Sequence, residues 1–209
     1  MSDEFDKPFP VPRRWPESTI VLIAGGRSLT AQQICVVWRA RKTGRCRVIA
    51  INDAYRIAPW ADVLYFADGS VKWYGWHKDR PEFKAFRGMR LTIEAADRAP
   101  GVHWLKNYGT KGLSENRDGV MSGSHSGHQA LNIAIHLGAR RIVLLGYDCR
   151  GDHWFGEHPN KTAMNFGGWI ANFRGIVERL AALNIKVLNC SPGSAIDAFP
   201  KRKLESALQ

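Results

Sequence analysis

Short apolar runs alternate with longer helical stretches along most of the chain. The clearest runs cover residues 19–24, 47–51, 62–66, 141–145 and 185–189, and each ends in a small or polar turn. Apolar strands that alternate with helices are typical of a parallel sheet whose two faces are both covered by helices. The pattern therefore predicts a single-domain α/β fold, Rossmann-like, with a mainly parallel sheet.

The remaining segments complete this outline. Weaker strands are expected at 90–93 and 102–105, helices at 30–42, 73–76, 126–137 and 163–183, and one or two short helices within 194–208. Residues 106–123 are rich in glycine and asparagine and predict a long loop. Residues 1–18 are proline-rich and predict an extended arm, which leaves 19–209 as the Rossmann-like domain.

Composition agrees with a globular protein. The chain has 209 residues, of which 44% are hydrophobic and 23% charged, and this excludes disordered, collagen-like and fibrous classes. The first apolar run is too short to span a bilayer, and the polar residues before it do not resemble a signal peptide. We therefore expect a cytoplasmic protein with no integral membrane segment.

Outside the loops, the cysteines and histidines are expected to have structural roles. The four cysteines are scattered, without a CxxC pair, so neither a disulfide framework nor a redox role is expected. Cys35 falls in an apolar helical stretch and is expected in the core. His103 and His136 are expected at the edge of the core, and His77 at the surface.

The charge balance points to an anionic partner. Lys and Arg number 30 against 19 Asp and Glu, which gives a net charge of +11. Nucleic acid, a phosphorylated small molecule and an acidic membrane surface all fit this sign. The densest cluster is formed by Arg39, Arg41, Lys42, Arg45 and Arg47. Because it lies at a predicted helix end, it also fits a solvated terminus that complements the helix dipole.

Polar residues gather where the predicted strands end. They are Gly25, Gly26, Arg27 and Ser28 after the first strand, Asn52 and Asp53 after the second, Asp68 after the third, and Asp148 after the run at 141–145. In open α/β sheets the ligand crevice lies beyond the carboxyl ends of the strands. One shared ligand site at this edge is therefore expected.

Two turns at this edge fit the binding of phosphate. The glycines of the first turn would let backbone amides approach an anion, although they equally fit a tight turn. The turn has neither the GxGxxG nor the GxxxxGK[ST] spacing, which disfavours NAD binding and P-loop hydrolysis. Ser126 and Gly127 open the helix at 126–137 and fit either an anion site or simple capping. The nearby His125 and His128 would add charge or a base.

The loop after the run at 141–145 offers histidines for catalysis. His158 and His153 are candidate general bases, because an imidazole titrates near neutral pH. Cys149 with these two histidines also raises a zinc hypothesis, but a structural site needs a fourth ligand and paired spacing. No metal site is therefore predicted.

Four segments together resemble a known group of Rossmann-like proteins. They are AGGRSL at 24–29, INDAY at 51–55, SG-x9-LG-x7-GxD at 126–148 and NCSPGSAI at 189–196. These segments look like the bacterial sialyltransferases of the Campylobacter type and equally like archaeal 6-hydroxymethylpterin diphosphokinase-like domains. The chain is also similar to a group of tailed-phage and prophage proteins that share this domain. The resemblance covers residues 19–200.

The resemblance implies a nucleotide or nucleotide-sugar ligand at the strand ends, either a CMP-type donor or ATP, with Mg²⁺ left open. From the sialyltransferases, Gly25, Gly26, Ser28, Asn52, Ser126 and Gly127 would hold the nucleotide, and His158 or His153 would be the base. From the diphosphokinase relatives, Asp53, Asp68 and Asp148 would assist nucleotide and metal binding. Arg27 would offset phosphate charge.

Two functions stay open at this point. The first is a transferase that moves a glycosyl or phosphoryl-type group from a nucleotide-activated donor. The second is a non-enzymatic phage or prophage morphogenesis or accessory protein, acting in the host cytoplasm, that binds nucleic acid or a protein partner through its basic surface. Salt dependence separates them, because contacts with several backbone phosphates weaken steeply with salt.

Overall fold

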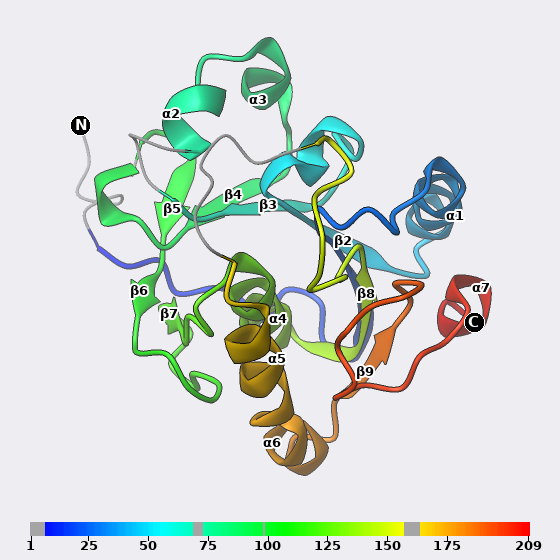
Figure 1. The fold of residues 1–209 in the computed structure, drawn as a ribbon. Coiled ribbons are helices and arrows are strands. Elements are labelled where there is room, and N and C mark those ends of the chain that lie inside the picture. Colours follow the sequence, from blue (N-terminus) through cyan, green and yellow to red (C-terminus); the bar gives the residue numbers. More distant parts are fainter. Residues whose placement is uncertain (1–6, 69–72, 98, 157–163) are drawn as a thin grey trace.

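A seven-stranded sheet, parallel throughout, forms the centre of the computed structural model, which describes residues 7–68, 73–97, 99–156 and 164–209 (Figure 1). The strands are β1 (Ser18–Ile23), β2 (Arg47–Ile51), β3 (Val63–Phe66), β4 (Met89–Thr92), β5 (Val102–Trp104), β8 (Ala139–Leu145) and β9 (Lys186–Asn189), in the spatial order β5-β4-β3-β2-β1-β8-β9. The prediction of a Rossmann-like α/β fold is confirmed.

Helices cover both faces of this sheet. They are α1 (Ala31–Lys42), the 3-10 helix η2 (Asn52–Arg56), α2 (Trp73–His77), α3 (Pro81–Ala85), the 3-10 helix η3 (Ala95–Asp97), α4 (Ser126–Leu137), α5 (Phe166–Arg174), α6 (Val177–Ala182) and α7 (Leu204–Ala207). No helix among the described residues is long and apolar enough to cross a membrane.

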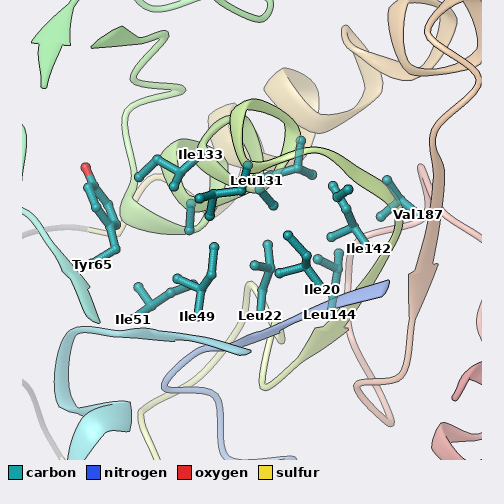
Figure 2. Packing of buried hydrophobic residues seen from close by; sticks show 14 of the residues in the cluster. Ile20, Leu22, Ile49, Ile51, Tyr65, Leu131, Ile133, Ile142, Leu144 and Val187 are labelled. Carbon is teal, nitrogen blue, oxygen red and sulfur yellow. The ribbon is translucent and has the colours of Figure 1, made fainter. Parts of the chain in front are cut away.

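Alternation along each strand divides the core into two layers. In β1, Ile20 and Leu22 face the layer that contains α4, whereas Val21 and Ile23 face the layer that contains α1 and α7. Figure 2 shows the first layer, with Leu131 and Ile133 of α4 above the side chains of the sheet. Because both sides are buried, the strands read as continuous apolar runs rather than alternating ones.

The order of the strands reverses at β1. This strand pairs with β2 on one side and with β8 on the other, so the connections from β1 run in opposite directions across the sheet. At such a point the loops that leave the two strands diverge and open a crevice. The loops after Ile23 and Leu145 are therefore where a ligand is expected.

Most predicted elements match the structure, but the short helices η2, α3 and η3 were not predicted, and two predicted segments differ. The expected helix at 163–183 is two helices, α5 and α6, which are separated at Gly175 and Ile176, and residue 163 lies outside the described part. Glycine at that position weakens helix continuity. The expected loop at 106–123 contains a short parallel pair, β6 (Lys106–Asn107) and β7 (Gly119–Val120).

The described part of the N-terminal segment, residues 7–17, lies along the domain. The backbone N–H of Phe9 donates to the carbonyl of Trp104 at 2.9 Å, and that of Val11 donates to Arg117 at 2.8 Å. The side chain of Val11 is fully buried in the α4 layer. The segment is thus tied to the body by both backbone and core contacts.

Two expectations about single residues are wrong. Cys35 is exposed rather than in the core, because α1 buries the stripe that contains Val37 and Ala40, and Cys35 lies roughly 200° around the helix from Val37. His77 is buried rather than at the surface. Its Nδ1 lies 2.8 Å from the hydroxyl of Tyr55, and burial lowers its pKa to about 4.

Candidate functional site

A cavity of about 500 Å³ opens at the carboxyl edge of the sheet, at the β1/β8 reversal. This volume is within the usual range for small-molecule sites. Its lining includes Gly25, Gly26, Asn52, Asp53, Asp68, Ser126, Gly127, Asp148 and His153. The structure therefore brings together nine of the candidates named from the sequence. Arg27 and Ser28 do not line it, and His158 lies outside the described residues.

The glycine turn after β1 is bound tightly to the loop after β8. The Gly26 amide donates to the carbonyl of Gly146 at 2.8 Å, and a Cβ on Gly26 would lie 2.5 Å from the Asp148 carboxyl carbon. The Asp148 carboxylate accepts hydrogen bonds from both the amide (2.8 Å) and the hydroxyl of Ser28. Ser28 and Asp148 therefore hold two loops together, and their hydrogen-bonding groups are used within the protein.

Arg27 does not line the cavity, although it pairs with a residue that does. Its side chain is mostly exposed and lies 3.6 Å from the Asp152 carboxylate. The guanidinium is paired with a carboxylate at the cavity, so the expected role of Arg27 at a phosphate stays a prediction. Arg150 also lines the cavity, but its guanidinium lies against Gly193, outside the lining, since a Cβ on Gly193 would be 2.4 Å from Arg150 Nη2.

His153 reaches the cavity because the loop at 149–156 folds back over the glycine turn. The Trp154 amide donates to the Gly25 carbonyl at 2.9 Å, and the His153 ring stacks on Phe155 with centroids 4.9 Å apart. A Cβ on Gly25 would lie 2.6 Å from the His153 ring. Glycine is thus required at position 25 for this histidine to occupy the edge of the cavity.

Asn52 presents a buried oxygen that has no partner among the described residues. Its Nδ2 group donates to the Ser126 hydroxyl at 3.3 Å, while Oδ1 accepts no hydrogen bond. A buried acceptor left unpaired costs about 1–3 kcal/mol, and ligand binding commonly satisfies such a group. Its neighbour Asp53 is already occupied, because it accepts from the indole of Trp73 at 2.8 Å and from Arg56 at 3.1 Å.

The N-terminus of α4 faces the same cavity. His125 caps the helix by accepting from the His128 amide at 3.3 Å, so Ser126 and Gly127 occupy the first turn, where amides have no partner within the helix. The Ser126 hydroxyl accepts from Asn52, which leaves its own hydrogen free to donate. These groups together form a set of donors suited to an anion.

The two histidines at this helix end are neutral at physiological pH. Burial, with a smaller contribution from His128, lowers the pKa of His125 to about 3. Burial also lowers the pKa of His128 to about 4. The expectation that they add positive charge is therefore wrong. Their contribution is hydrogen bonding and shape, with His125 packed against Trp169 and Phe173.

Carboxylates occupy the part of the cavity beyond β3 and β4. Asp68 follows β3 and Glu94 follows β4, and both line the cavity. Burial, with smaller effects of these two charges, holds the pKa of Tyr65 well above its usual value. Glu94 was missed from the sequence because the strand before it is weak, although it is the first charged residue after that strand.

Backbone strain concentrates around this cavity. Among the described residues, six that are not glycine have a positive φ, and four of them line the cavity: Asn52 (50°), Asp68 (74°), Ser124 (60°) and Cys149 (47°). Such conformations are costly for residues with a Cβ, and they gather at functional sites. The location of the strain is thus independent support for a ligand site at this edge.

Cys149, the cysteine of the zinc hypothesis, also lines the cavity. Burial, with the nearby charge of Asp148, raises the pKa of the Cys149 thiol to about 12, so it stays protonated at neutral pH. Within the described ranges, no group of three or more His, Cys, Asp or Glu side chains is placed to hold a metal ion. His158, the third residue of the zinc hypothesis, lies outside the described ranges.

Comparison with known proteins gives no match: no family model, no curated protein and no solved structure matches this chain.

Proposed function

We propose that the protein is a transferase that binds a nucleotide, or a nucleotide-activated donor, in the cavity at the β1/β8 reversal. The observation that carries the proposal is the pairing of the α4 N-terminus with Asn52, whose buried Oδ1 has no partner among the residues that the structure describes. Free amides and a hydroxyl suit a phosphate. An amide side chain beside them suits the donor and acceptor groups of a base or a ribose.

The donor and the acceptor would occupy different parts of the cavity. Phosphate oxygens would lie at Ser126 and Gly127, in the first turn of α4. The acceptor would lie toward β3 and β4, where Asp68 and Glu94 can accept hydrogen bonds from its hydroxyl groups. Repulsion between these carboxylates and the phosphates favours this arrangement over the reverse one.

His153 is the proposed general base. It lines the cavity, whereas His125 is used as a helix cap and has a pKa too low for efficient proton abstraction at neutral pH. The imidazole would take the proton from the acceptor hydroxyl. The acceptor oxygen would then form a bond to the anomeric carbon or phosphorus of the donor. The bond to the nucleotide's phosphate oxygen would break, and the nucleotide would leave with the electron pair.

A thermal-shift panel tests the binding part of this proposal. CMP, CDP, UDP, GDP, ATP and NAD would be added with and without Mg²⁺, at low and high salt. A ligand that binds only the folded chain raises the Tm by mass action. The proposal expects a shift with at least one mononucleotide that survives high salt. No shift with any nucleotide would contradict it.

Two matched serine variants locate the ligand. Ser126→Ala removes the hydroxyl donor in the cavity, and Ser206→Ala removes an exposed hydroxyl on α7. A hydrogen bond to a charged group contributes about 1.5–3 kcal/mol, so Ser126→Ala should weaken binding by about tenfold or more. Ser206→Ala should leave it unchanged. Equal behaviour of the two variants would place the ligand elsewhere.

A further inference from the structure

A second hollow, of about 520 Å³, lies at the opposite edge of the sheet. It is formed where β2 begins at Arg47 and β4 begins at Met89, together with the residues that precede β3. The N-terminal segment contributes Arg14 and Trp15, and the end of α1 contributes Arg41. We call this hollow the arginine groove. It shares no lining residue with the cavity at the carboxyl edge.

Four arginines and one carboxylate set the charge of the arginine groove. The arginines are Arg14, Arg41, Arg47 and Arg87, and Asp62 is the acidic residue of its lining. Asp62 is nearly buried, and it is engaged by a two-point contact with Arg41, at 3.1 and 2.8 Å. The groove therefore presents a net charge of about three positive units, without a free carboxylate to oppose an anion.

Two of these guanidinium groups are unengaged. Arg14 and Arg87 are exposed, and neither makes an ion pair within the described part of the chain. Arg47 lies 3.8 Å from Asp62, which is too long for a hydrogen bond, and its guanidinium is 5.6 Å from the centre of the Trp15 ring. Planar, weakly hydrated guanidinium groups are well suited to phosphate oxygens.

Indole rings flank these cations. Trp15 and Trp60 both line the arginine groove, and both are half-buried. Aromatic faces between cations are the arrangement on which successive bases stack while the backbone phosphates are neutralised. An acidic peptide would use the arginines but would gain little from two indoles.

We infer that the arginine groove binds single-stranded nucleic acid. Arg14, Arg47 and Arg87 contact backbone phosphates, and Trp60 stacks against a base. A single strand fits better than a duplex, because its bases can enter a hollow that the outer surface of a duplex cannot. This inference does not depend on the proposed transferase activity, since it concerns the other edge of the sheet.

Fluorescence anisotropy with a labelled oligothymidylate of about ten nucleotides tests the inference. Three neutralised phosphates predict a slope of log K against log salt of about −2, because single strands release about 0.7 counterion per contact. The double variant Arg14→Ala/Arg87→Ala should weaken binding by about tenfold and reduce the slope to about −1. Trp60→Leu should weaken binding about fivefold or more at high salt, where stacking dominates.

The matched control removes the same charge outside the arginine groove. Arg39 and Arg45 are exposed cations near the end of α1 that do not line it, so Arg39→Ala/Arg45→Ala should change affinity by less than about threefold. Equal weakening by the two double variants would show diffuse attraction and overturn the site. Competition by polyglutamate as strong as that by the oligonucleotide, or tighter binding of a duplex, would overturn the assignment of the ligand.

Discussion

The two edges of the sheet offer polar groups of different kinds. At the carboxyl edge the ligand-facing groups are mainly backbone amides, short side chains and carboxylates, held by close loop contacts and by strained residues such as Asn52 and Asp68. At the amino edge they are long arginine side chains and indoles on an unstrained frame. The first arrangement suits one small ligand in a fixed pose, and the second suits a flexible polyanion.

This difference has a physical origin in the parallel sheet. The reversal of strand order at β1 creates a crevice at the carboxyl edge only, and the glycine turn must approach Gly146 closely to form it. The amino edge has no such crevice, so its hollow is assembled from the N-terminal segment and the end of α1. Substitutions should therefore affect folding and binding differently at the two edges.

Among the substitutions, the largest effect on stability is expected from Gly26→Ala at the carboxyl edge. The new Cβ would lie 2.5 Å from both the Gly146 oxygen and the Asp148 carboxyl carbon, so the loops must separate. Overpacking of this kind costs about 1–3 kcal/mol, and we expect the upper end because one neighbour is backbone. Chemical denaturation measures the free energy of unfolding.

Gly167→Ala is the control for that substitution. Gly167 lies in α5 with open space around its Cβ position, so alanine should be neutral or raise the stability by up to about 1 kcal/mol. Equal stability of the two alanine variants would contradict the close packing of the two turns.

At the amino edge, Asp62→Ala should destabilise the fold by about 2 kcal/mol. The substitution leaves the Val48 amide without its 2.9 Å acceptor and leaves Arg41 beside Arg47 without a counter-charge. Asp79→Ala, at an exposed site paired only with Lys78 and Lys84 among the described residues, should change stability by less than about 0.5 kcal/mol. Equal losses of stability in the two variants would mean that the contacts of Asp62 with Arg41 and Val48 do not stabilise the arginine groove.

Acid should destabilise the carboxyl edge through His125. Its pKa is about 3 in the fold and about 6.5 in the unfolded chain, so only the unfolded chain gains this proton between those values. The stabilisation is complete above about pH 6.5 and is lost as the pH falls toward 3, by up to about 1.4 kcal/mol per pH unit. Urea titrations at a series of pH values measure this slope.

His125→Asn separates that titration from the cap. Asparagine is a good N-cap but does not titrate. The change in the free energy of unfolding per pH unit, between about pH 6 and 5, should therefore be smaller by the contribution of one histidine. His128, His77 and the carboxylates still titrate in both proteins. An unchanged slope would mean that His125 is protonated in the fold.

The smallest expected change in stability is at Asp68. Glycine relieves its positive φ of 74°, so Asp68→Gly should raise the stability by about 0.5 kcal/mol, and Asn184→Gly, at φ 56° in an exposed turn, should do the same. Only Asp68→Gly should impair group transfer, because Asp68 lines the cavity. If the two variants transferred the group at the same rate, the positive φ of Asp68 would serve the fold and not the ligand site.

The sequence predicted the elements of this fold better than the roles of individual side chains. The helix at Ser126–Leu137 was predicted to the residue, because its apolar stripe and Gly138 define both its length and its end. Asn52 and Asp68 were found because strand ends can be read from hydrophobic runs. Glu94 follows a weak strand, and for that reason it was missed.

Side-chain direction and long-range pairing explain the remaining differences. Arg27 was expected at a phosphate, but it pairs with Asp152, and Ser28 is used by Asp148, which is 120 residues away along the chain. The arginine groove combines five segments of the sequence. The charged cluster seen in the sequence contains only two of its arginines, Arg41 and Arg47. Arg14, Arg87 and the hollow itself could not be found that way, because strand order is not encoded in a local pattern.

The most direct test of two separate sites is one binding experiment on two variants. The affinity of the mononucleotide that gives the largest thermal shift would be measured by calorimetry for the wild type, Ser126→Ala and Arg14→Ala/Arg87→Ala. The account predicts that Ser126→Ala weakens binding by about tenfold or more and that the arginine variant does not change it. Loss of nucleotide binding in the arginine variant, with Ser126→Ala unaffected, would contradict it.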